Sequence, residues 1–145
     1  MLLSRQIQVN SKGFTMTNTP PPPGVDFEGL WKNGLQSEME LSVNGNKVTG
    51  KYRANVGAPQ PTEEFDLVGW ATEDLITFTV NFGKYGSLTA WVGQHTEVRP
   101  GEYEIRTLWH LAKDIPDADE HENLWAAVLA GANTFFTSAL RSRNY

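Results

Sequence analysis

The stretch that decides the fold is EYEIRTLWHL, residues 102–111, in which side chains of two kinds alternate with a period of two. Such alternation predicts a β-strand with one buried face. The inward face is expected to carry Ile105, Thr107, Trp109 and Leu111, and the outward face Glu104, Arg106, Leu108 and His110. Trp109 is therefore expected to point into the protein.

Working outward from this stretch, short alternating segments recur between turn signals about 8–12 residues apart, which is typical of an all-β sandwich or barrel. The pair Asn44-Gly45 is a strong hairpin signal. The predicted strands are Phe27–Asn33, Glu38–Val43, Lys47–Ala54, Glu64–Trp70, Leu75–Phe82, Ser87–Gln94, Glu102–Leu111 and, after a helical turn at Asp119–Trp125, Ala126–Thr137. We predict an all-β fold, an eight-stranded antiparallel up-and-down β-barrel that can hold a small ligand at its mouth. A two-sheet sandwich is the alternative.

The domain organisation follows from length and from one proline run. At 145 residues the chain has the length of a single domain. Residues 1–26 contain Pro20–Pro23, which cannot lie inside a sheet. We predict a flexible Pro-rich N-terminal tail at residues 1–26, a barrel domain at 27–138 and a C-terminal tail at 139–145.

Composition excludes several classes of function. The formal net charge is −5 and the basic residues are scattered, so no electrostatic footprint for nucleic acid or an anionic membrane is present. Cysteine is absent, which excludes disulfides and thiol catalysis. No apolar run approaches the roughly 20 residues that span a bilayer. The N-terminus lacks the roughly 7–15-residue apolar core of a signal peptide, and the sequence leaves the compartment open.

Catalytic and metal-binding patterns are also missing. The three histidines are isolated and lack the spacing of a metal site. The acidic clusters at Glu63–Glu64 and Asp114–Glu122 are interpreted as solvated loops, without the inward partner that acid–base catalysis requires. We expect no catalytic residue, no metal and no cofactor, so the protein is predicted not to be an enzyme.

A ligand pocket is indicated by tryptophans beside polar groups. Trp91, Trp109 and Trp125 fall in successive segments of the chain. The inward polar residues near them are Ser87, Thr89, Thr107 and Asn133. Aromatic walls with a few polar groups among them are typical of a ligand pocket. The alternative is a tryptophan-rich core with satisfied hydroxyls.

Two strands carry apolar side chains on the face opposite the predicted pocket. These residues are Leu88, Ala90 and Val92 in one strand and Val128, Ala130 and Ala132 in the last. Exposed apolar residues in such a group suggest a surface that another subunit buries. The alternative is a register error of one residue, which would swap both faces.

Six sequence motifs, in order, resemble the avidin/streptavidin family of biotin-binding proteins, in its bacterial type, over about residues 29–136. The motifs are Gly29–Ser37, Val48–Tyr52, Phe78–Phe82, Thr89–Gln94, Thr107–Leu111, and Asn123–Trp125 with Gly131–Phe135. The resemblance implies non-enzymatic, high-affinity binding of biotin in a barrel-mouth pocket, with biotin as ligand and no cofactor. Because lipocalins share the Gly-x-Trp start, a lipocalin-like carrier of another small apolar ligand is the alternative.

The resemblance also implies a role for individual residues. Asn33, Ser37 and Tyr52 are similar to the three donors around the ureido oxygen of biotin, and Asn133 to the acceptor for a ureido N–H. Thr89 is similar to the contact of the thioether sulfur, and Ser87 to that of the valerate carboxylate. The residues expected to wall the ring and add apolar contact are Phe82, Trp91, Trp109, Leu35, Val56 and Leu111. Trp125 resembles the tryptophan that closes the site of a neighbouring subunit.

Three positions depart from the family pattern. Ala54 stands where a hydroxyl usually receives a ureido N–H, with Asn55 or a water as a substitute. Ala58 stands where the lid loop often supplies a polar residue, and Phe82 replaces a tryptophan. We therefore expect tight binding that is weaker, or faster to release, than in the best members. The resemblance further implies a homo-oligomer, with a tetramer favoured over a dimer. It also implies a secreted or extracellular protein that captures free biotin or the biotin of biotinylated proteins.

Overall fold

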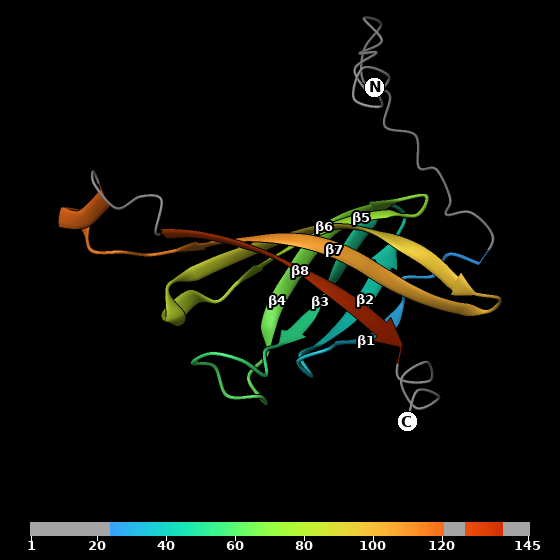
Figure 1. The fold of residues 1–145 in the computed structure, drawn as a ribbon, viewed down its shortest axis with the longest axis horizontal. Helices are drawn as coiled ribbons and strands as arrows, with labels where there is room; N and C mark the ends of the chain where they lie inside the picture. Colours follow the sequence, from blue (N-terminus) through green and yellow to red (C-terminus); the bar gives the residue numbers. More distant parts are fainter. Residues whose placement is uncertain (1–23, 121–126, 138–145) are drawn as a thin grey trace, which may run out of the picture.

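Antiparallel strands follow one another around a closed barrel in the computed structural model, which describes residues 24–120 and 127–137 (Figure 1). The strands are β1 (Gly29–Asn33), β2 (Glu38–Asn44), β3 (Lys47–Arg53), β4 (Phe65–Thr72), β5 (Leu75–Asn81), β6 (Ser87–Arg99), β7 (Glu102–Lys113) and β8 (Val128–Thr137). Each strand pairs with the next, and β8 closes on β1 through pairs such as Trp31 with Thr137. The predicted eight-stranded up-and-down barrel is confirmed, and the two-sheet sandwich is excluded.

The hairpin of β6 and β7 is longer than predicted. Its pairing runs from Arg99 opposite Glu102 to Ser87 opposite Lys113, so β6 gains residues at its end and β7 extends past Leu111. Figure 1 shows the two strands as the longest ribbons of the barrel. The extension matters for function because it adds Lys113 to the inward-facing row of β7.

The first strand is shorter than predicted and begins at Gly29. Gly29 has a φ of +106°, which is outside the strand region and suits glycine. Phe27 is buried before this kink, and its carbonyl oxygen accepts the indole N–H of Trp31 at 2.9 Å. Phe27 is therefore apolar because it packs in the core of the barrel, although it lies before the first residue of β1.

Two short 3₁₀-helices lie between strands: η2 (Gly83–Tyr85) between β5 and β6, and η3 (Asp117–Asp119) between β7 and β8.

Several predictions fall wholly or partly outside the described residues. Of the helical turn predicted at Asp119–Trp125, only Asp119 and Glu120 are described, and Trp125 is outside. The predicted tails lie outside as well, except for residues 24–26. Among the described residues, no helix has the length and apolar character needed to cross a bilayer.

The barrel is filled at one end and open at the other. Along the inner face of β7, Ile105 and Thr107 are buried, Trp109 and Leu111 are half-buried, and Lys113 is exposed. The fully buried large side chains are Trp31, Met39, Leu41, Val48, Leu67, Phe78, Val80, Ile105 and Phe135. This core therefore closes the end of the barrel near Ile105 and leaves space toward Lys113.

The outer face of β6, β7 and β8 is apolar, as the sequence pattern predicted. The residues of this surface, which we name the outer patch, are Leu88, Ala90, Val92, Leu108, His110, Ala112, Val128, Ala130 and Ala132. Val92 is 64% exposed and Leu108 is 67% exposed, and the two residues pair across the β6–β7 ladder. The alternative of a one-residue register error is excluded, because the pocket-facing residues of the same strands point inward.

Candidate ligand-binding site

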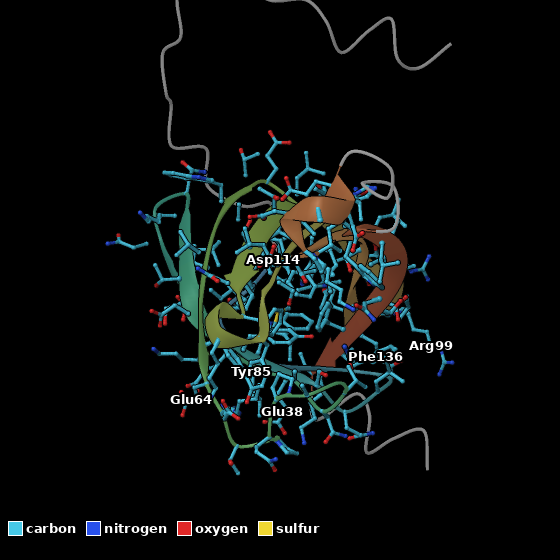
Figure 2. All side chains as sticks on the ribbon, turned by 90° about the vertical axis from the view of Figure 1, so that its left-hand side faces the viewer. Glu38, Glu64, Tyr85, Arg99, Asp114 and Phe136 are labelled. Atoms are coloured by element: carbon cyan, nitrogen blue, oxygen red, sulfur yellow. The ribbon has the colours of Figure 1, made fainter. Side chains whose placement is uncertain are left out.

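A cavity of about 370 Å³ occupies the open end of the barrel. Figure 2 shows the molecule from the end that carries Tyr85 and Asp114. This volume is in the range of small-molecule sites. The predicted site residues that line the cavity are Asn33, Leu35, Ser37, Tyr52, Val56, Phe82, Ser87, Thr89, Trp91, Trp109, Leu111 and Asn133. The fold thus brings these residues together, while Trp125 lies outside the described residues.

One group of polar residues comes from the β1–β2 turn. Asn33 is buried at the end of β1, and its Oδ1 accepts the backbone N–H groups of Leu35 at 3.1 Å and Ser37 at 3.0 Å. Asparagine commonly forms such bonds in turns, because its side chain mimics a backbone group. Since the turn occupies Oδ1, the amide is oriented with its NH₂ group on the other side, where Asn33 hydrogen-bonds with Tyr52.

Ser37 and Tyr52 complete this polar group. Ser37 Oγ accepts the backbone N–H of Asn55 at 2.9 Å, and the Ser37 hydroxyl also hydrogen-bonds with Tyr52. Burial raises the pKa of Tyr52, although its hydrogen bonds with Ser37 and Asn33 act in the opposite direction. Tyr52 therefore remains protonated at neutral pH. We name Asn33, Ser37 and Tyr52 the donor cluster, because each presents an N–H or O–H group.

The opposite wall offers other polar groups. Thr89 is buried, and its hydroxyl has no hydrogen-bond partner among the described residues. Asn133 Oδ1 accepts the indole N–H of Trp91 at 3.3 Å, which leaves acceptor capacity on that oxygen. Thr107 was expected among the polar groups of the pocket, but its hydroxyl donates to the carbonyl of Asn133 at 2.9 Å, and Thr107 does not line the cavity.

Aromatic rings form the sides of the cavity and support one another. Trp91 stacks on Phe78 with ring centroids 4.9 Å apart and lies 5.2 Å from Tyr52. Phe82 meets Tyr52 edge to face at 5.9 Å. These contacts hold the rings in place before any ligand arrives, which reduces the ordering that binding requires.

The mouth of the cavity is apolar on the side of the loop after β3. Ala54 is buried and lines the cavity together with Val56 and Ala58, so none of these positions offers a polar side chain to a ligand. Asn55, considered as a substitute for the missing hydroxyl of Ala54, does not line the cavity. Its side-chain NH₂ donates instead to the carbonyl of Leu35 at 3.1 Å.

Five further cavity residues were not proposed for the site from the sequence: Gly57 and Pro59 in the loop after β3, and Tyr85, Lys113 and Leu129. Lys113 lies two residues beyond Leu111 on the inward row of β7, so the correct end of that strand would have found it. Leu129 lies two residues before Gly131, inside the predicted last strand and on the face opposite Val128 and Ala130. Tyr85 lies in η2, where no periodicity reveals the direction of a side chain. Its hydroxyl donates to Glu63, which also pairs with Lys84 at 3.2 Å.

The described lining of the cavity combines aromatic, apolar and neutral polar side chains with one lysine. Among the described residues that line the cavity, none is an acid or a histidine, and the described part of the chain has no group of three residues able to hold a metal ion. The arrangement combines hydrogen-bond donors at one place, an acceptor and an unpartnered hydroxyl opposite, and aromatic rings between them.

Comparison with known proteins shows similarity both in sequence and in fold. The avidin family model matches residues 22–138. Avidin of Gallus gallus is 31% identical over 116 residues, which cover 74% of this chain and 74% of avidin. The crystal structure of xenavidin matches with a TM-score of 0.66 and 29% identity, over 77% of this chain and 96% of that chain.

A biotin complex of a shwanavidin variant shares the fold, with a TM-score of 0.62 and 22% identity over 77% of this chain and 97% of that chain. The family model extends over the whole described barrel, and the avidin match covers more than two thirds of the chain. The chain therefore belongs to the avidin family.

Proposed function

We propose that this protein binds biotin in the cavity at the open end of the barrel and does not convert it. The observation that carries the proposal is the donor cluster. The acceptor oxygens of Asn33 and Ser37 are engaged by backbone N–H groups, so this cluster presents donors to a ligand. A ureido carbonyl oxygen is a ligand group that several converging donors suit.

The physical argument is that of a preorganised polar site. Donors fixed in a water-poor pocket stabilise charge on a carbonyl oxygen more strongly than water does, because they require no reorganisation. In this pose Asn133 Oδ1 accepts one ureido N–H, and the Thr89 hydroxyl faces the sulfur-containing ring. Trp91, Trp109 and Phe82 enclose the bicyclic ring by apolar contact.

The second ureido N–H has no side-chain acceptor at Ala54. An unpaired buried donor costs about 1–3 kcal/mol. We therefore expect biotin to dissociate faster than from a member with a hydroxyl at this position.

Two other functions fit the site less well. A lipocalin-like carrier of an apolar ligand would place an alkyl chain against Asn33, Ser37 and Tyr52, and the desolvation of these groups without new partners is costly. An enzyme of this fold would need an acid or base at the ligand, and none is found among the described lining residues. Family membership supports binding without turnover.

We further propose that the protein is a homo-oligomer, with a tetramer favoured over a dimer. The outer patch supplies the apolar surface that such contacts bury. In the proposed assembly Trp125 completes the site of a neighbouring subunit, and the sites take up free or protein-linked biotin.

The experiment that tests the proposal separates biotin from apolar ligands. The wild-type protein and a variant with Asn33→Ala and Ser37→Ala are titrated with biotin and with an apolar fluorescent probe. Loss of biotin binding with retained probe binding supports the ureido pose. A wild-type protein that binds the probe and not biotin would instead establish the lipocalin-like carrier. Circular dichroism controls for folding, because Asn33→Ala removes hydrogen bonds within the β1–β2 turn and Ser37→Ala removes one to the loop after β3.

A further inference from the structure

The cavity has one charged side chain at its mouth. Among the described residues that line it, Lys113 alone carries a charge at neutral pH, and the other side chains are apolar or neutral polar groups. An isolated cation at the entrance of a mostly apolar cavity favours a ligand that is neutral in its inner part and anionic at its outer end.

The position of Lys113 follows from the register of β6 and β7. Lys113 is the last residue of β7, two residues beyond Leu111 on the inward face. It pairs with Ser87, the first residue of β6. Directly paired residues of an antiparallel ladder have Cβ atoms about 4.5–5.5 Å apart. Lys113 and Ser87 therefore form a neighbouring cation and hydroxyl on the same rim.

Two other charged residues near this rim, Glu63 and Lys84, engage each other. Glu63 pairs with Lys84 and accepts the hydroxyl of Tyr85. Lys113 forms no ion pair with any residue in 24–120 or 127–137. Asp114 follows Lys113 in sequence but does not line the cavity, and its backbone N–H donates to Gly86.

The proposed orientation of biotin brings its carboxylate to this rim. In the proposed function, on which this inference rests, the donor cluster holds the ureido group at the inner end of the cavity. The valerate chain then extends toward the mouth. There the loop after β3 contributes Ala58 without a polar side chain, while Ser87 and Lys113 stand on the strand side.

We propose that Lys113 is a specificity-determining residue that makes the site prefer free biotin over biotin joined through an amide. The free acid is a carboxylate at neutral pH and forms an ion pair with the ammonium, assisted by the Ser87 hydroxyl. The amide linkage of a biotinylated protein replaces that carboxylate with a neutral group. It retains the ureido and ring contacts and loses the ion pair.

The test compares two ligands on matched variants. The dissociation constants of biotin and of biotinamide are measured by competition at pH 7 and low salt, for wild type, Lys113→Gln, Lys113→Arg and Lys113→Glu. The informative quantity is the ratio of the two constants, since a general loss of stability affects both ligands alike. The control is Lys47→Gln. It removes the same charge from the first residue of β3, which does not line the cavity.

We expect Lys113→Gln to reduce the preference for biotin over biotinamide by about three- to tenfold, the range between an exposed ion pair and a charge-assisted hydrogen bond. Lys113→Arg and Lys47→Gln should keep the wild-type ratio. Lys113→Glu should shift the preference further toward biotinamide. High salt should reduce the wild-type preference, because it screens exposed charges.

An unchanged ratio in both Lys113→Gln and Lys113→Glu, with both ligands still bound, would overturn the role of Lys113 and leave biotin binding intact. A wild-type protein that binds neither ligand would instead overturn the proposed function. The two failures are therefore distinguishable.

Discussion

Trp109 and Gly131 face each other across the β7–β8 ladder, and the indole ring occupies the space that a side chain at Gly131 would need. A Cβ atom built on Gly131 would lie 2.3 Å from Cζ2 of Trp109. The φ of Gly131 is not positive, so its backbone conformation does not require glycine. The need for glycine at this position comes from the indole ring alone. The glycine therefore sets the position of one aromatic wall of the cavity.

The first prediction concerns this contact. Gly131→Ala should displace Trp109 and lower the free energy of unfolding by about 1–3 kcal/mol, the usual cost of overpacking. Biotin affinity should fall as well, because the ring no longer walls the ligand. Thermal denaturation and a biotin titration followed by tryptophan fluorescence measure both effects.

Gly50→Ala is the matched control for that substitution. Its Cβ would meet the carbonyl oxygen of Glu40 at 2.0 Å, in a part of the barrel that does not line the cavity. It should lower stability and leave the biotin affinity of the folded protein unchanged. Equal losses of affinity in the two variants would show that Trp109 has no special role.

The second prediction uses the unpartnered hydroxyl of Thr89. Thr89→Val should raise the free energy of unfolding of the ligand-free protein by about 1 kcal/mol, because it removes a buried hydroxyl without a partner. The same substitution should weaken biotin binding. Chemical denaturation measures the stability, and calorimetry measures the biotin affinity. A gain in stability together with a loss of affinity would identify Thr89 as a residue that contacts the ligand.

Thr107→Val is the control, since the Thr107 hydroxyl donates to the carbonyl of Asn133. This variant should be less stable than wild type. If Thr89→Val destabilises the protein as much as Thr107→Val, the hydroxyl of Thr89 has a structural partner and the interpretation is wrong.

The third prediction is a pH dependence that arises at the closed end. His95 is 6% exposed and packs against Phe27, Trp31 and Tyr103. Burial lowers the pKa of His95 below its ordinary value of 6.5, although Asp26 and Asp74 act in the opposite direction. The folded protein therefore resists protonation of a residue that the unfolded chain protonates readily.

The sign of the effect follows from proton binding. Between the folded pKa of His95 and 6.5, the unfolded state binds more protons, so stability falls as the pH decreases through this window. Above 6.5 the contribution is constant. The urea midpoint should fall more between pH 7.5 and 5.5 in wild type than in His95→Gln. An equal decrease in both proteins would assign the effect to other groups.

The fourth prediction concerns the outer patch. Leu108 is 67% exposed and lies between Val92 and Ala132 in the ladders of β6, β7 and β8. Leu108→Glu should place a charge in the proposed subunit contact and reduce the mass measured by light scattering. Thr49→Glu, on the exposed side of β3, should leave the mass unchanged. A wild-type protein with the mass of one chain would contradict the proposed assembly.

Much of this fold could be predicted because a barrel imposes a period of two on every strand. The alternation assigned to residues 102–111 and the two outward apolar rows hold in the structure, except that Glu104, assigned to the outward face, is buried. The twelve described residues proposed for the site also meet around one cavity. Their binding roles remain predictions.

What the sequence did not reveal depends on strand ends and loops. The alternating pattern of residues 102–111 predicts a strand that ends at Leu111, because Ala112 and Lys113 no longer contrast as polar outside and apolar inside. Pairing with Ser87 continues the strand and places Lys113 at the cavity. In the same way, the direction of Asn55 depends on a bond to the carbonyl of Leu35, which lies far away in sequence.

The most direct test of the account is a titration of the wild-type protein with biotin, followed by heat and tryptophan fluorescence together. The account predicts saturation at one biotin per chain with quenching, because Trp91 and Trp109 line the cavity. No heat and no quenching at micromolar biotin would contradict it. In that case the avidin-family barrel would be adapted to another ligand.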